Sequence, residues 1–423
     1  MKEINLKGLN EIIYYDECNN GLKVYLWVNK KVNSYYGTLS VRYGSIYNSF
    51  KVGKKEYNTP YGIAHFLEHI KFNESKDYTA QDYFKESGCD TNAFTTFDYT
   101  NYQVFGNTDC AKNICHLLDF VENDYFTKKI VKDEKGIIIE EANSTMDNPY
   151  AMMYFNMINN LFRNSSYSKI ITGEEKDIKN ITYDDIKLVY NTFYHPKNMF
   201  LVVTGNFNPY EVMEGIKENE AKKEIKSFIK PSRISKKDSK KVSIKYEEAN
   251  KNVSTKKIMI GIKIPSNNLK DYDDIHIRLL LNILLNANFG STSDFREELL
   301  NKELINNMGF SYDLIDNYYI VTITIESNYK EEIINLINSK LDNISINEKT
   351  FNRKKKCNIA ALILDYESVE TVNDLLQFEI LNYGDVISNY KEIYEKLKYK
   401  DILDFIKQVN LKERSILIYN PKE

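Results

Sequence analysis

The stretch MFLVVTGNF at residues 199–207 is nearly all apolar, and we predict a strand there that is buried on both faces. A helix is predicted just before it, opening with a capping box formed by Thr182 and Asp185. A similar strand is predicted for RSILIYNP at 414–421, which holds the place in the second half that 199–207 holds in the first. Between the two, further strands and helices alternate at 257–265, 271–288, 318–327 and 330–341. This repetition favours two α+β halves of about 200 residues each over one mixed sheet.

The first half carries its own pattern of strands and helices. Strands are predicted at 23–29 and 37–44, a hairpin turns around Thr96–Asp98, and helices are predicted at 61–74, 76–88, 109–121 and 128–146. The charge-rich stretch KENEAKKEIKSFIKPSRISKKDSKK reads as a solvated linker. We therefore expect a first half at 1–216, a linker at 217–241 and a second half at 242–423. Each half should be a mostly antiparallel sheet with helices packed on one face.

Composition excludes some classes of protein. The 57 basic and 60 acidic residues nearly balance, which argues against a nucleic-acid binder. Five cysteines without paired metal-type spacing predict reduced, buried thiols and a cytoplasmic location. The first residues lack an export-type apolar segment, and no stretch approaches 18 apolar residues, so we expect no membrane anchor.

The segment GIAHFLEHIKFNES at 62–75 contains two of the five histidines. On a helix, His65, Glu68 and His69 project into one arc, and two imidazoles at i and i+4 are a common zinc grip. His-x-x-Glu-His is the inverted zincin signature, with the glutamate placed to deprotonate water. The alternative is a helix that carries two histidines by accident. The remaining histidines have no glutamate at metal spacing, and we expect structural roles for His116, His195 and His276.

A catalytic zinc site usually has three protein ligands, so a third is needed. VKDEKGIIIEEANSTMDNP at 131–149 offers Glu134 and Glu141, seven residues apart and thus on one helix face. Glu140 points about 100° away. By itself, such a carboxylate pair is more often a solvated helix face. Because the chain also contains an inverted zincin helix, we favour the interpretation that both carboxylates point towards the metal.

GIAHFLEH, NAFTTFDYTNY and EKGIIIEEANSTMDNP, in this order and spacing, resemble the insulinase/pitrilysin family of zinc metallopeptidases. The chain looks most like its small two-domain bacterial members and the catalytic subunit of mitochondrial processing peptidase. The similarity covers residues 10–210 and is weaker over 245–423. It implies one zinc ion per chain, bound by His65, His69 and Glu141, which makes 1–216 the catalytic half and 242–423 the non-catalytic one. It also implies Glu68 as general base and Glu134 as a supporting carboxylate that orients a ligand imidazole.

The resemblance further implies an endopeptidase acting on extended peptides or unfolded segments, with the leader of a ribosomally made peptide among the candidates. In the family a strand matching GCDTNAFTTF pairs with substrate, which points to Asn92, Ala93 and Phe94. For Phe94, a plain core position is an equal alternative. A catalytically silent peptide-binding or scaffold subunit and a zinc-storage protein are the other hypotheses.

The second half of family members usually carries an Arg and a Tyr that grip the substrate, in Leu-Arg-x-x-x-Gly-x-x-Tyr. Matching STSDFREELLNKELINNMGFSY to this pattern, with Leu299 at its Leu, puts Leu300 at the Arg, Leu304 at the Gly and Asn307 at the Tyr. Arg296 and Tyr312 lie nearby at the wrong spacing. We therefore expect a heterodimer with a homologous subunit that supplies this pair and lacks the zinc motif, with a homodimer as the alternative.

Overall fold

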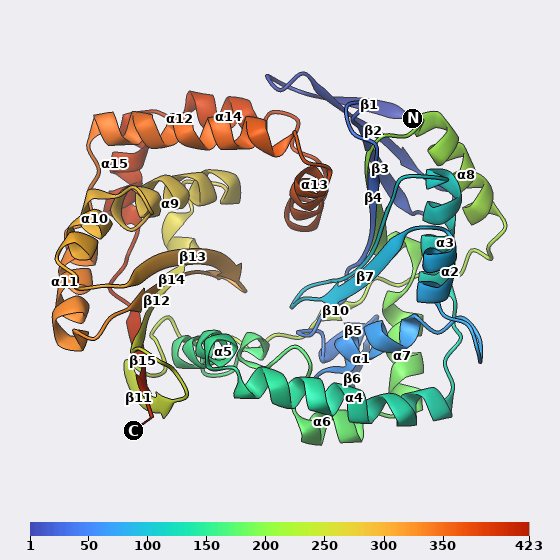
Figure 1. Ribbon diagram of the computed structural model, residues 1–423, viewed down its shortest axis with the longest axis horizontal. Coiled ribbons are helices and arrows are strands. Elements are labelled where there is room, and N and C mark those ends of the chain that lie inside the picture. The colour runs from blue at the N-terminus through green and yellow to red at the C-terminus, as the bar shows by residue number, and fades with distance from the viewer. Residues whose placement is uncertain (423) are drawn as a thin grey trace. The chain divides into compact units, whose positions relative to one another are not determined.

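The computed structural model describes residues 1–422, which form two compact units, each assembled from separate stretches of the chain (Figure 1). The first unit contains Met1–Ser144, Lys169–Ser235 and Leu362–Tyr390; the second contains Thr145–Ser168, Lys236–Ala361 and the described residues from Lys391 onwards. This division differs from the contiguous halves expected at 1–216 and 242–423. A segment near residue 150 belongs with the second unit, and one near residue 375 with the first.

A seven-stranded sheet forms the centre of the first unit, in the order β1-β2-β3-β9-β4-β8-β7. Only the β3–β9 pair is parallel. Strand β7 therefore lies at one edge. The strands are β1 (Lys2–Leu6), β2 (Glu11–Glu17), β3 (Lys23–Val28), β4 (Tyr35–Val41), β7 (Asp90–Thr95), β8 (Thr100–Gly106) and β9 (Met199–Gly205), with a small sheet of β5 (Ser49–Val52), β6 (Lys55–Asn58) and β10 (Ser232–Arg233).

Helices cover both faces of this sheet, so the expectation of helices on one face is wrong for the first unit. Neighbouring residues of β4 show this: a Cβ on Gly37 would meet Ile114 of α3 at 2.2 Å, whereas the Thr38 hydroxyl bonds to Asn373 of α13. Successive strand residues point to opposite faces, so α3 and α13 cover opposite faces. The helices are α1 (Ile63–Lys71), α2 (Ala80–Glu86), α3 (Cys110–Glu122), α4 (Lys128–Asp147, continuing past this unit), α6 (Glu175–Asn180), α7 (Tyr183–Phe193), α8 (Pro209–Ala221) and α13 (Val369–Tyr383), with the 3-10 turn η2 (Pro196–Asn198).

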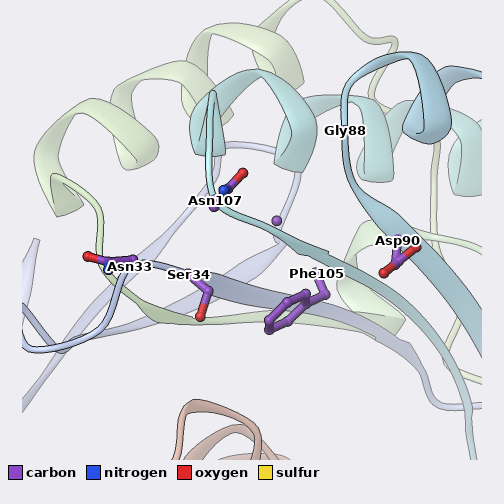
Figure 2. A pocket seen from close by; sticks show the side chains of 7 residues that line it. Asn33, Ser34, Gly88, Asp90, Phe105 and Asn107 are labelled. Atoms are coloured by element: carbon purple, nitrogen blue, oxygen red, sulfur yellow. The ribbon is translucent and has the colours of Figure 1, made fainter.

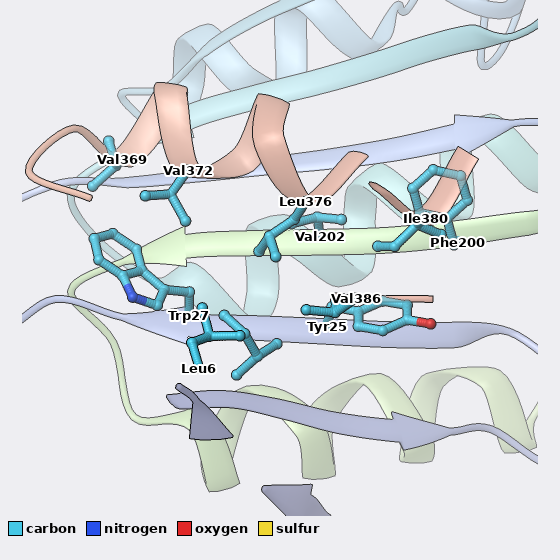
Figure 3. Close-up of a cluster of buried hydrophobic side chains, with 11 residues drawn as sticks. Leu6, Tyr25, Trp27, Phe200, Val202, Val369, Val372, Leu376, Ile380 and Val386 are labelled. Carbon is cyan, nitrogen blue, oxygen red and sulfur yellow. The ribbon is translucent and has the colours of Figure 1, made fainter. Parts of the chain in front are cut away.

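Helix α13 is attached to the sheet by an apolar cluster and a buried polar network. In the cluster, Val372 and Leu376 pack with Trp27, Phe200 and Val202, as Figure 3 shows. Beside it, the amide groups of two buried α13 side chains bond to hydroxyl and amide groups of β4 and β8, namely Asn373 to Thr38 and Gln377 to Ser40 and Asn101. Because every bond is buried, these polar contacts fix the register of α13 along β4.

The second unit repeats the topology of the first. Its sheet has the order β11-β15-β12-β14-β13, with only β11–β15 parallel, which matches β3-β9-β4-β8-β7 strand for strand. Helix α5 packs on β12 and β15 as α13 packs on β4 and β9. The elements are α5 (Pro149–Leu161), η1 (Ser166–Ser168), β11 (Tyr246–Lys251), β12 (Lys257–Pro265), η3 (Ser266–Leu269), α9 (Asp274–Asn288), α10 (Asp294–Asn301), β13 (Asn307–Ile315), β14 (Tyr318–Glu326), α11 (Lys330–Asp342), α12 (Glu348–Asp365), α14 (Tyr390–Lys396), α15 (Tyr399–Gln408) and β15 (Arg414–Pro421).

The predicted α+β class with two related halves is confirmed, as is the capping box of Thr182 and Asp185. The expected linker is partly ordered, because α8 extends to Ala221 and β10 pairs with β5. All five cysteines are free, but only Cys18 and Cys89 are buried; Cys110 and Cys115 are partly buried and Cys357 is exposed. No helix within residues 1–422 has the length and apolar character needed to cross a membrane.

Candidate metal centre and active site

Helix α1 begins at a crowded glycine that fixes its position. Gly62 has φ 84°, in the left-handed region that favours glycine, and a Cβ there would lie 2.2 Å from the Thr172 carbonyl oxygen. This close approach sets the start of α1 against the loop before α6. His65, Glu68 and His69 follow on one side of the helix, as the sequence predicts.

Glutamates of α4 meet the two histidines of α1. Glu141 lies with one carboxylate oxygen 3.3 Å from His65 Nε2 and the other 3.3 Å from His69 Nε2. One ligand atom from each of these three residues lies within 4.8 Å of the others. Ligand atoms around a tetrahedral zinc ion are separated by roughly 3.3–3.6 Å, given metal–ligand distances of 2.0–2.2 Å. The donor set and its spacing therefore fit zinc.

Glu134 occupies a different place from Glu141. Its carboxylate accepts a hydrogen bond from His69 Nδ1 at 2.9 Å, on the opposite side of the ring from the nitrogen that faces Glu141. A bond of this kind fixes the tautomer and orientation of a ligand imidazole. Burial opposes protonation of His69, but the bond to Glu134 and the neighbouring carboxylates raise its pKa overall. Hydrogen bonding to His65 lowers the pKa of Glu141.

Glu68 is buried beside the histidines, with 6% of its surface exposed. Its carboxylate accepts a hydrogen bond of 2.7 Å from the Thr95 hydroxyl at the end of β7. Burial raises the pKa of Glu68, and the positive charges and hydrogen bond around it offset only part of this effect. Thr95 was not identified from the sequence. The alternation of side chains along the predicted strand indicates on which face of the sheet Thr95 lies. Its contact with Glu68, however, depends on how α1 packs against β7.

The backbone of β7 is partly open because the strand lies at the sheet edge. Thr96 N–H bonds to Tyr99 O, so alternation directs the backbone groups of Phe94 and Asn92 towards β8 and those of Ala93 and Thr95 towards the open edge. The Ala93 N–H accordingly bonds to no strand; it donates to the side-chain oxygen of Asn92 at 2.9 Å.

The other predicted residues lie away from this site. His116 stacks on Tyr83, His195 on Phe228, and His276 contacts Asp273 at the start of α9, which agrees with structural roles. The Arg296 guanidinium bonds locally to the Met308 carbonyl oxygen.

A pocket of about 330 Å³ lies at the start of β7, lined by Asn33, Ser34, Gly88, Asp90, Phe105, Gly106 and Asn107. Figure 2 shows Asp90 and Phe105 on neighbouring strands and Asn107 towards the helices. Asp90 is five residues from Thr95, or roughly 17 Å along the strand. This pocket is therefore remote from Glu68 and is no part of the candidate active site.

Comparison with known proteins identifies the family. Residues 36–175 match the family model described as insulinase, peptidase family M16, and residues 180–356 match the model of the peptidase M16 inactive domain. The chain belongs to the insulinase family. An uncharacterized zinc protease of Bacillus subtilis, YmfH, is 36% identical over 320 residues, which are 75% of this chain and 74% of YmfH.

Two further insulinase-family relatives cover most of the chain. Zinc protease PqqE of Helicobacter pylori is 26% identical over 363 residues, 78% of this chain and 79% of PqqE. The crystal structure of a putative M16-like peptidase from Alicyclobacillus acidocaldarius has a TM-score of 0.91 at 25% identity, covering 97% of this chain and 99% of that one. Zinc is thus the cofactor associated with this family.

Proposed function

We propose that this chain is an active zinc endopeptidase that cleaves extended peptides or unfolded segments. The observation that carries this proposal is the convergence of His65 Nε2 and His69 Nε2 on the Glu141 carboxylate at 3.3 Å, beside buried Glu68. Zinc storage would not need Glu68. Membership of a family of zinc proteases supports the same reaction.

The three ligands and Glu68 divide the chemistry between them. Zinc bound by His65, His69 and Glu141 would supply a Lewis acid for the scissile carbonyl and the attacking water. Glu68 accepts a proton from that water and passes it to the leaving amine. The burial of Glu68 favours its protonated form, which is the form that donates the proton to the leaving amine. Glu134 holds the His69 ring in place through Nδ1.

The substrate would pair along the open edge of β7. The outward backbone groups of Ala93 and Thr95 can bond to an extended peptide, which would displace the Asn92 side chain from the Ala93 N–H. Pairing there brings a peptide bond close to Glu68, because Thr95 is hydrogen-bonded to it. Folded domains have no free extended segment to offer, so we expect unstructured substrates, such as the leader of a ribosomally made peptide.

The competing reading is a catalytically silent peptide-binding subunit. Purified chain should contain about one zinc per molecule and hydrolyse unstructured peptides, and Glu68→Gln should retain the metal while losing activity by several orders of magnitude. Zinc-loaded wild type that binds peptides without cleaving them would establish the silent subunit instead. Near-wild-type turnover by Glu68→Gln would refute its role as base.

We also propose a homologous partner subunit. Leu300 and Asn307 stand where family members carry the Arg and Tyr of the substrate clamp. A partner with that pair and without the zinc motif would complete the site. Mixing the chain with a co-encoded homologue should raise activity well above that of either alone, whereas full activity of the isolated monomer or homodimer would refute the partnership. A cytoplasmic location stays a prediction.

A further inference from the structure

A second pocket, of about 490 Å³, lies between α13 and the β7–β8 hairpin, within the first compact unit. Most of its wall is apolar. Phe94 and Tyr99 come from the hairpin, and Leu375, Phe378 and Leu381 come from α13. The Phe378 side chain is 37% exposed, which is high for a large apolar residue on a helix that packs on a sheet.

The faces of α13 explain why this pocket stays open. Leu376 packs into the apolar cluster, and Asn373 and Gln377 bond to the strands beneath the helix. Leu375 and Phe378 lie on the remaining side, which faces the edge of the sheet. The buried polar bonds fix the rotation of α13, so the helix cannot turn these two side chains towards the core.

The register of β7 connects the pocket with the proposed active site. Thr95 contacts Glu68 on one face of the sheet, whereas Asn101, the cross-strand partner of Phe94, bonds to Gln377 of α13 on the other face. Cross-strand neighbours project to the same face. A peptide residue opposite Phe94 therefore directs its side chain towards α13, while its neighbour in the chain lies opposite Thr95 and close to Glu68.

We propose that this pocket is a specificity subsite that takes an aromatic or large aliphatic side chain of the substrate within two residues of the cleaved bond. The inference rests on the proposed peptidase function and assigns Leu375 and Phe378 of α13 to substrate selection. Asp374 adds an exposed carboxylate to the wall, which disfavours an acidic substrate side chain at this position.

Binding and cleavage are tested separately. The probes are fluorescein-labelled, serine- and alanine-rich peptides of about ten residues, carrying one Phe, Ala or Glu at each position in turn. Their affinities are measured with zinc-loaded Glu68→Gln protein, and their kcat/KM values with the wild type. Leu375→Trp fills the pocket, Phe378→Ala removes part of its wall, and Leu364→Ala is the control at a 61% exposed apolar residue outside it. Zinc content and circular dichroism verify that each variant folds.

At one position, we expect the Phe peptide to bind at least tenfold more tightly than the Ala peptide, and the Glu peptide to bind worst. Leu375→Trp and Phe378→Ala should each reduce the preference to below threefold, and Leu364→Ala should leave it unchanged. Equal affinity of Phe and Ala peptides, or an unchanged preference in both pocket variants, would overturn the subsite; if only one variant folds, that variant decides. If the preference for Phe is seen in binding but the wild-type protein cleaves no peptide, the peptidase function is refuted and the subsite stands. If the wild type cleaves peptides without preferring Phe, the subsite is refuted and the peptidase function stands. If no peptide binds at all, both the subsite and the peptidase function are refuted.

Discussion

The hydrogen bond between Glu134 and His69 should determine how tightly the site holds zinc. Loss of such a carboxylate typically weakens metal affinity 10- to 100-fold, because the imidazole is no longer held in its binding orientation. The two side chains keep 20% and 23% exposure, so water can replace part of the lost bond in Glu134→Ala. We therefore expect the lower end of the range, about tenfold, or about 1.4 kcal/mol. Glu134→Gln keeps a neutral acceptor and should lose less.

Competition with a chromophoric chelator at buffered free zinc measures these affinities. Glu140→Ala is the matched control, because Glu140 is an exposed neighbour on α4 that points away from the histidines in the predicted helical geometry. The expected order of zinc affinity is wild type and Glu140→Ala first, Glu134→Gln next and Glu134→Ala last. An affinity of Glu134→Ala within twofold of wild type, or an equal loss in Glu140→Ala, would refute the positioning role.

Three further outcomes follow from the site and from α13. Removing the metal with a chelator should abolish peptidase activity, and added zinc should restore it; activity in metal-free protein would contradict the mechanism. Asn373→Leu should destabilise the first unit by about 3 kcal/mol in urea unfolding, since Thr38 and the Val202 carbonyl oxygen lose a buried partner, whereas Glu370→Leu on the exposed side should change little. Burial raises the pKa of Glu379 to about 7, so ionisation costs stability as pH rises from about 4.5 to 7. Glu379→Gln should match wild type near pH 4 and exceed it at pH 8 in thermal unfolding; equal curves would refute this.

Much of the candidate site follows from local helix geometry. His65, Glu68 and His69 share one arc because residues three and four apart on a helix are neighbours, and this holds however the helix packs. Glu134 and Glu141 share a face of α4 for the same reason. The strands, the two related halves and the capping box at Thr182 are likewise local, since they follow from alternation, repetition and hydrogen bonds within a few residues.

Contacts between elements distant in sequence were decided by the tertiary structure. The sequence patterns predicted neither α13 nor α5, and the folded structure places α13 with the first unit and α5 with the second. The hydrogen bond of Thr95 to Glu68, and the different places of Glu134 and Glu141 around His69, depend on how α1 packs against β7 and α4. A sequence pattern determines which side of an element is apolar or polar; the docking of those sides depends on shape and hydrogen-bond complementarity, which exist only once the chain is folded.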